Sequence, residues 1–344
     1  MRPNWAPCHP ASAGRYLGMN RGQLTRIRPV APVIGFFIAV EALAQGLGPP
    51  PFLPGVGPGP GDGGPRCHQV RMAASPNGYD FEAQGDVLLG QASVPEGVLT
   101  QAGLAFYYVN GGNQHGMFRA KANGASWDRG EPVLLDGAFN SNAVDPDVVV
   151  LGNGRYRMFY FEGDFGGSPR PGGPNPVSYF YSALSDDGIT FTVEGQVFEA
   201  EGGTDPTAVR LDDGTWLLAV ARGQANEVIV ARSADGAVFE VVNTLTGAGI
   251  PELSLTPGGV RLFFNGLNGI ISAHSTDLGG TWDLEPGFRL STRSLAADPS
   301  VIAMPDGSWR MFYKTVDGDC APAGGGAGPG PPPPPVPPGR PRGP

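Results

Sequence analysis

The sequence DPDVVVLGNGRYRMFYF, residues 145–161, has the pattern of a β-hairpin. A valine-rich run leads into a turn that contains Gly152, Asn153 and Gly154, and a second run of aromatic and apolar residues follows. Glycine and asparagine tolerate the backbone angles of tight turns, whereas valine and aromatic residues favour strands. The stretch therefore predicts two antiparallel strands joined by a short turn.

The same hairpin recurs along the chain, with copies that begin at Val94, Asp145, Asp205, Ile250 and Asp298. Most copies are followed by a second hairpin, such as YSALSDDGITF from Tyr181 or SAHSTDLGGTW from Ser272. The spacing of roughly 45 to 60 residues fits a four-stranded propeller blade with its loops. The repeat therefore predicts a five-bladed β-propeller.

The order of the half-units predicts how the ring closes. The last copy has no second hairpin after it, while a matching segment, MAASPNGYDF from Met72, precedes the first copy. A β-sandwich would not explain why the unpaired half lies at the opposite end of the chain. We therefore expect an all-β, five-bladed propeller in which the N-terminal strands close the last blade.

Two cysteines flank the repeats, Cys67 before the N-terminal half-unit and Cys320 after its partner strands. Neither has the spacing of a zinc site. Their positions predict a disulfide that locks the shared blade, and free thiols are the alternative.

The N-terminal region has the features of an export signal. Arginines at 21, 26 and 28 precede an apolar run at 30–40, and Ala-Leu-Ala follows at 42–44. This run is too short to span a bilayer, so we expect cleavage near Gln45 and no membrane insertion afterwards. The mature protein would then be secreted or periplasmic.

Composition divides the chain into four parts. Residues 1–44 are assigned to the leader and signal peptide, 45–66 to a Gly/Pro-rich linker, 67–320 to the propeller and 321–344 to a disordered Pro/Gly-rich tail.

The formal net charge of -9 and pI near 4.9 provide no basic surface for nucleic acid or anionic lipid. We expect a monomer with no organic cofactor.

Acidic residues cluster where the first strand of each blade begins, next to a proline. Since inner strands start at the rim of the central channel, these side chains are expected to converge there in two tiers, about 6.5 Å apart along the strands. The acids before proline are Asp145, Asp205 and Asp298, and those after proline are Glu96, Asp147 and Glu252.

The five units, their DPxxV starts and their DDG and PDG turns resemble glycoside hydrolase family 43, in the arabinanase, levansucrase and invertase superfamily, over residues 68–315. The resemblance implies a triad of acids from blades one, three and four. By position, Asp205 corresponds to the acid that tunes pKa and orientation, and Glu252 to the general acid. The general base has no clean match, because Val94 stands where the family has Asp. Glu96 is the nearest acid, and Asp145 is the other candidate.

This resemblance implies a hydrolase of arabinose-, xylose- or fructose-containing glycans, which the N-terminal signal would direct to export. In the inverting mechanism, Glu252 would protonate the leaving oxygen while Glu96 or Asp145 activates water, with the carboxyls about 6.5–9.5 Å apart. Asp205 would lie close to Glu252 and raise its pKa by like-charge repulsion.

Two other functions remain open. A non-catalytic carbohydrate-binding propeller would explain the missing blade-one Asp, and aromatic residues would then stack on sugars: Tyr107, Tyr160, Trp127 and Phe264. A sialidase-like enzyme is suggested by the Asp-box pattern of residues 275–282, SxDxGxTW, which we interpret as a structural turn. Arg157 and Arg310 occupy equivalent strand positions, so they do not form the arginine trio that a sialidase needs.

A central structural cation is compatible with the sequence, which does not identify one.

Overall fold

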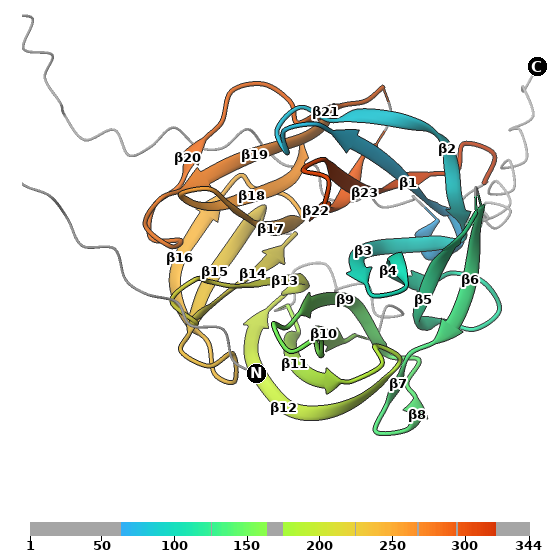
Figure 1. Cartoon of the computed structure of the whole chain (residues 1–344). Coiled ribbons are helices and arrows are strands. Elements are labelled where there is room, and N and C mark those ends of the chain that lie inside the picture. Colours follow the sequence, from blue (N-terminus) through green and yellow to red (C-terminus); the bar gives the residue numbers. More distant parts are fainter. Residues whose placement is uncertain are drawn as a thin grey trace, which may run out of the picture. The chain divides into compact units, whose positions relative to one another are not determined.

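The computed structural model describes residues 63–124, 126–163, 175–223, 225–266, 268–293 and 295–320. Within these residues the chain forms strands β1 to β23 and one short 3-10 helix, η1 (Gly64–Cys67). The strands make five sheets arranged as blades in a ring (Figure 1). The predicted all-β, five-bladed propeller is confirmed.

Each blade is an antiparallel sheet that runs from an inner strand at the channel to an outer strand. Blade one contains β3 (Ala92–Thr100), β4 (Gly103–Asn110), β5 (Gly116–Asn123) and β6 (Ser126–Pro132). Blade two contains β9 (Ala143–Val150), β10 (Tyr156–Glu162), β11 (Val177–Ser185) and β12 (Thr190–Glu201). Blade three contains β13 (Thr204–Arg210), β14 (Trp216–Arg222), β15 (Glu227–Ser233) and β16 (Glu240–Thr246). Blade four contains β17 (Pro251–Thr256), β18 (Gly259–Gly266), β19 (Gly269–Ser275), β20 (Asp283–Leu284) and β21 (Leu290–Ser291).

Blade five joins the two ends of the described chain. Its strand order is β22 (Ala297–Ala303), β23 (Trp309–Val316), β1 (His68–Ser75) and β2 (Glu82–Gly90). β1 pairs with β23 without a register shift, from His68 opposite Val316 to Ser75 opposite Trp309. A disulfide joins Cys67 to Cys320, with their Cα atoms 5.4 Å apart. The N-terminal closure and the cysteine pairing are therefore as predicted.

The sequence did not predict one small hairpin. β7 (Leu134–Leu135) and β8 (Ala138–Phe139) lie between blades one and two, and β7 pairs parallel to β12 at the edge of blade two. This hairpin widens blade two beyond the four strands that the repeat implies.

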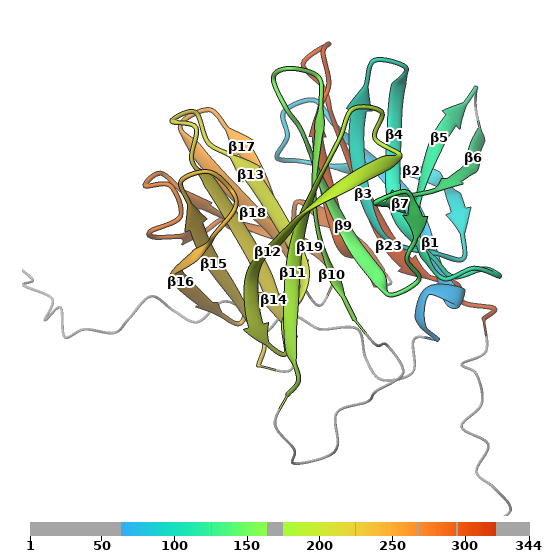
Figure 2. The same cartoon turned by 90° about the horizontal axis from the view of Figure 1, so that it is seen from below.

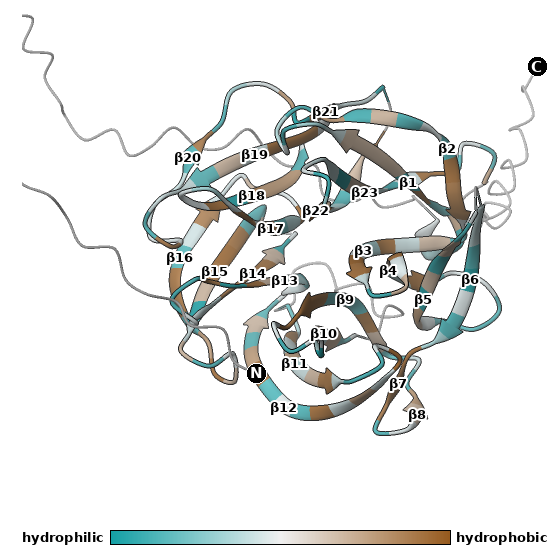
Figure 3. Ribbon diagram, viewed as in Figure 1, coloured by the Kyte–Doolittle hydropathy of each residue, from teal (hydrophilic) through white to brown (hydrophobic). Residues whose placement is uncertain are grey.

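The hydrophobic core lies between the faces of neighbouring blades. Side chains alternate along each strand, so both faces of a central strand are buried against adjacent blades. Between blades two and three, for example, the Phe159 ring makes edge contacts with Trp216 and Phe239. Hydrophobic residues accordingly concentrate on the strands, and hydrophilic residues on many of the turns (Figure 3).

The turn at residues 275–282 has the hydrogen bonds expected of its sequence. Ser275 Oγ accepts from the backbone N–H of Gly279, whose φ is 92°, and Asp277 Oδ1 accepts from the N–H of Thr281. Trp282 is buried and donates from Nε1 to the carbonyl of Gly279. This turn stabilises the blade and contributes no side chain to the cavity described below.

The inner strands β3, β9, β13, β17 and β22 surround the channel, and each contacts the next around a closed ring. Figure 2 shows the blades from the side. We call the end where the inner strands begin the strand-start face, and the opposite end the strand-end face.

The predicted leader and signal peptide, most of the linker and the tail lie outside the described residues. The last residues assigned to the linker begin η1 instead. In the part of the chain that the structure describes, no helix has the length and apolar character needed to cross a membrane.

Candidate functional site

The inner strands carry a backbone irregularity at the residue before proline. Val94, Asp145, Asp205 and Asp298 have φ angles of 47–50°, and the pairing of each strand with its neighbour shifts at this point. Asp tolerates this left-handed conformation, whereas it is strained for a β-branched residue such as Val94. Blade one therefore keeps the backbone of the Asp-Pro blades without their carboxylate.

The residues after the prolines form a ring of hydrogen bonds between blades. In every blade, the side chain directly after the proline accepts a hydrogen bond from a backbone N–H of the next blade. The donor is the second residue after the proline of that next blade, and the ring closes from blade five to blade one. The acceptor and donor pairs are Glu96 with Val148 (3.5 Å), Asp147 with Ala208 (3.0 Å), Thr207 with Leu253 (3.0 Å), Glu252 with Val301 (2.9 Å) and Ser300 with Gly97 (2.9 Å). These bonds hold the inner strands in a fixed relation and fix one oxygen of each carboxylate.

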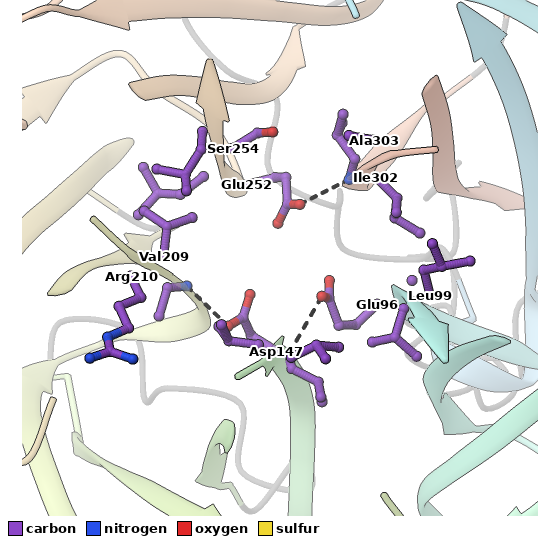
Figure 4. Close-up of a pocket in the computed structure, with 18 of the residues that line it drawn as sticks. Glu96, Leu99, Asp147, Val209, Arg210, Glu252, Ser254, Ile302 and Ala303 are labelled. Carbon is purple, nitrogen blue, oxygen red and sulfur yellow. Dashed lines mark hydrogen bonds between the residues drawn. The ribbon is translucent and has the colours of Figure 1, made fainter. Parts of the chain in front are cut away.

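Three members of this ring are acids, and we call Glu96, Asp147 and Glu252 the carboxylate trio. One oxygen from each lies within 4.8 Å of the others. All three side chains point toward the centre of the channel (Figure 4). Each is buried, with 5–9% of its surface exposed.

Burial raises the pKa of every carboxylate in the trio, and repulsion by neighbouring acids adds to this for Glu252 and Glu96. Burial is the main cause in each case. The pKa of Asp147 is raised to about 8. The pKa of Glu252 is raised well above its usual range by burial and then by Asp147, and that of Glu96 by burial and then by Glu252 and Asp147. The like charge that acts on Glu252 is thus Asp147, rather than Asp205 as the sequence suggested.

The trio forms the inner end of a cavity of about 490 Å³ that extends along the channel to the strand-end face. This volume is within the usual range for small-molecule sites. The walls are mostly aliphatic, with side chains such as Val209, Leu253 and Ile302, while Trp309 and Arg210 contribute an aromatic ring and a cation toward the exposed strand ends. The cavity therefore has mostly apolar walls, with hydrogen-bonding acids at its inner end.

A second group of charges lies at the pre-proline positions. Lys314 Nζ is 2.6 Å from Asp298 Oδ2, and both side chains are buried. The pKa of Asp145 is raised well above its usual range by burial, then by Asp205 and Asp298. The pKa of the half-buried Asp205 is raised to about 6 by burial and then by Asp298. These acids and Lys314 form one electrostatic group on the strand-start side of the trio.

The space between the two groups is narrow. A gap of about 20 Å³ is lined by members of both tiers, including Asp205, Asp298 and Glu252. It has room for about one water molecule and none for a sugar ring. A substrate in the 490 Å³ cavity therefore reaches the trio, while the pre-proline acids face the other side.

The structure therefore places the four predicted catalytic residues in two separate groups. Glu252 and Glu96 meet in the trio, and Asp145 and Asp205 belong to the pre-proline group. The trio also contains Asp147, which the sequence placed in the ring of acids but not among the catalytic candidates; its position directly after proline, as in Glu96 and Glu252, was the available signal. One oxygen of Glu96 lies within 4.8 Å of one oxygen of Glu252, and the role of these two acids as an inverting pair stays a prediction.

Within the described residues, the trio also has the geometry to bind a cation. Carboxylate oxygens are the preferred ligands of hard cations such as Ca²⁺, and one oxygen from each acid can reach a common point.

The aromatic residues considered for sugar stacking have other roles. Tyr107, Tyr160 and Phe264 are buried between blades, and Trp127 packs against Phe106. Arg157 pairs with Glu194 away from the channel, consistent with a structural role.

Comparisons with known proteins support the fold. No family model matches the chain, and no curated protein matches it. A solved thermostable family 43 glycoside hydrolase is 14% identical with a TM-score of 0.50, and the match covers 66% of this chain and 88% of that structure. The family 43 protein BlXynB of Bacillus licheniformis is 18% identical, with a TM-score of 0.47 over 64% of this chain and 48% of the other, so this chain spans about half of its length. A Hadza microbial sialidase is 18% identical, with a TM-score of 0.46 over 62% of this chain and 50% of the other. The chain thus has the five-bladed propeller fold found in family 43 structures.

Proposed function

We propose that this protein is a glycoside hydrolase that cleaves arabinose-, xylose- or fructose-containing glycans at the carboxylate trio. The observation that carries the proposal is the convergence of three buried acids with raised pKa values at the end of an open cavity. A carboxylic acid that stays protonated near neutral pH is what protonation of a glycosidic oxygen requires. The fold shared with a family 43 structure supports the same class of reaction.

Glu252 is the general acid in this proposal. Its Oε1 accepts from the Val301 N–H, and its Oε2 accepts from the Thr207 hydroxyl at 3.0 Å, so its orientation is fixed. The neighbouring Asp147 raises the pKa of Glu252 and keeps it protonated. Glu252 then donates its proton to the leaving oxygen as the glycosidic bond breaks.

Asp147 is the nucleophile. Oxygens within 4.8 Å resemble the roughly 5–5.5 Å separation of retaining enzymes more than that of inverting ones. The Asp147 carboxylate attacks the anomeric carbon and forms a glycosyl ester. Water then attacks the ester and returns a proton to Glu252, which releases the sugar and restores both acids. Burial, then Glu252 and Asp147, raise the pKa of Glu96, the third acid, so it also favours its protonated form.

A non-catalytic carbohydrate-binding propeller is the second candidate, and a specific observation favours it. Thr207 and Ser300 make the same inter-blade hydrogen bonds as the three acids, so the ring also has a purely structural explanation. In addition, Val94 occupies the pre-proline position of blade one, where the family resemblance implies a catalytic Asp. Binding without turnover would follow if the trio only ties the blades together.

Turnover by wild type and Glu252→Gln, compared on arabinan, xylan and fructan oligosaccharides, distinguishes the candidates. We expect kcat to fall at least about 10²-fold in Glu252→Gln with little change in substrate affinity. Glu240→Gln, an exposed substitution on β16, is the control and should keep wild-type turnover. Wild-type turnover that survives in Glu252→Gln would remove Glu252 from the mechanism, and wild-type binding without turnover would favour the second candidate.

We also infer that the chain is exported to the periplasm or outside the cell, with cleavage near Gln45. The Cys67–Cys320 disulfide supports this, because such bonds persist in oxidising compartments. Sequencing the N-terminus of the mature protein from expressing cells tests the inference, and an intact residue 1 in the exported fraction would contradict the cleavage.

A further inference from the structure

We propose that blade two carries a second carbohydrate-binding surface, separate from the channel, formed by stacked and exposed tyrosines. We call Tyr179 and Tyr181 the tyrosine platform, and the buried Tyr160 packs against it. The inference rests on the proposed function only for the class of ligand, which is a glycan chain. The platform would hold a stretch of polysaccharide while another part of the same polysaccharide enters the cavity.

A buried ring supports the platform from the neighbouring strand. Tyr160 on β10 is opposite Tyr181 on β11, with ring centroids 5.6 Å apart and planes inclined by 26°. Tyr160 is almost fully buried and supports the half-buried Tyr181. The Tyr181 ring is therefore held in one orientation before any ligand arrives.

Tyr179 extends this surface. It lies two residues before Tyr181 on the same strand, so both side chains project from the same face of the sheet. Tyr179 is 44% exposed, so its ring is accessible to a ligand. The two residues offer successive aromatic contacts along the strand.

Hydrogen-bonding groups flank the rings. Across β12, Gln196 pairs with Tyr181 and Glu199 with Tyr179, and Gln196 Nε2 donates to Glu199 Oε2 at 3.3 Å. On the inner side, the exposed Glu162 raises the pKa of both Tyr160 and Tyr181, after the larger effect of burial. Its carboxylate accepts from the Asn140 amide at 2.8 Å.

This combination matches the two kinds of surface on a sugar ring. The C–H faces of sugars pack on aromatic rings, and the hydroxyl groups around the edge hydrogen-bond to amides and carboxylates. The platform lies on the third strand of its blade, outward from β9 and the trio, so it would contact a part of the glycan remote from the reacting bond.

Binding measurements with Tyr179→Ala test the platform. The probes are soluble arabinan and xylan in affinity gel electrophoresis, and insoluble xylan in sedimentation. We expect affinity for at least one polysaccharide to fall about 3- to 10-fold, the usual size of an aromatic contact. Tyr181→Phe keeps the ring and should retain most of the affinity. Phe288→Ala removes a similarly exposed ring from blade four and is the matched control.

Binding is measured without turnover, so the result does not depend on hydrolysis in the channel. Equal affinities for Tyr179→Ala and Phe288→Ala would overturn the proposal. It would also be overturned if wild type, with its fold verified by circular dichroism, bound neither polysaccharide. A Tyr179→Ala loss in a protein that shows no turnover would retain the platform and refute the proposed hydrolase alone.

Discussion

Replacing Asp147 by Asn should stabilise the protein at neutral pH. The side chain is buried, lies within 4.8 Å of two other carboxylates, and receives the Ala208 N–H at 3.0 Å. Asparagine has nearly the same shape, keeps an oxygen acceptor for Ala208, and adds an N–H₂ group that can donate to the neighbouring carboxylates. The substitution therefore removes a costly charge while it keeps the inter-blade hydrogen bond.

The magnitude follows from the raised pKa of Asp147. The ordinary value of 3.8 applies to the unfolded chain, and burial raises the folded value to about 8. A group with a raised folded pKa contributes stability that is fully present below the unfolded pKa and is lost as pH rises toward the folded pKa. At pH 7, the raised pKa of Asp147 lowers the free energy of unfolding by about 4 kcal/mol. Replacing Asp147 by Asn removes this loss and should raise Tm by roughly 10 °C in a domain of this size.

Thermal and urea unfolding of wild type and Asp147→Asn at pH 4 and at pH 7–8 measures this effect. EDTA is included so that no cation neutralises the trio. The two proteins should differ little at pH 4, and the variant should be the more stable at pH 7–8. Asp212→Asn, in the exposed turn between β13 and β14, is the control and should show no such divergence. A variant no more stable than wild type at pH 8 would refute the reasoning that burial of the Asp147 carboxylate costs stability.

Other perturbations test separate parts of the account. Replacing both Cys67 and Cys320 by Ser should cost up to about 5 kcal/mol of unfolding free energy in urea, and a loss below about 1 kcal/mol would argue against a constraining role. Val94→Asp should fold with a Tm close to wild type, because three blades carry Asp in the same backbone conformation; failure to fold would show that the position requires an apolar side chain. Removing residues 321–344 should leave Tm unchanged, since Pro/Gly-rich sequence lacks the donors and apolar side chains to join a blade, and a drop of several degrees would contradict this. Initial hydrolysis rates should rise with pH toward about 8, as Asp147 loses its proton, and a maximum near pH 5 would exclude Asp147 as nucleophile. Light scattering after gel filtration should give the mass of a monomer, and a dimer would contradict that prediction.

The fold could be predicted from the sequence because its determinants are local and repeated. Each blade contains its own turn residues and strand patterns, and the half-unit at Met72 has no partner except the last blade. The disulfide followed from the same placement of Cys67 and Cys320. None of these inferences required knowledge of side-chain geometry.

The arrangement of the acids could not be predicted in the same way. VPE at Val94 and IPE at Ile250 look equivalent in sequence, yet only Val94 has a positive φ angle and a register shift. In blade four, Asn265 Oδ1 accepts the Ile250 N–H at 2.7 Å, which is a contact from the neighbouring strand. Tertiary contacts of this kind determine which acids meet, and the only available signal for Asp147 over Asp145 was its position directly after proline.

The stereochemistry of the first product tests the central claim most directly. Proton NMR during hydrolysis of a short arabinan or xylan oligosaccharide reports the anomer released before mutarotation. If the reaction takes place at Glu252 and Asp147, whose oxygens lie within 4.8 Å, the product should retain the configuration of the substrate. Release of the inverted anomer would contradict the account, because inversion is the outcome expected of carboxyl groups roughly 6.5–9.5 Å apart with water between them.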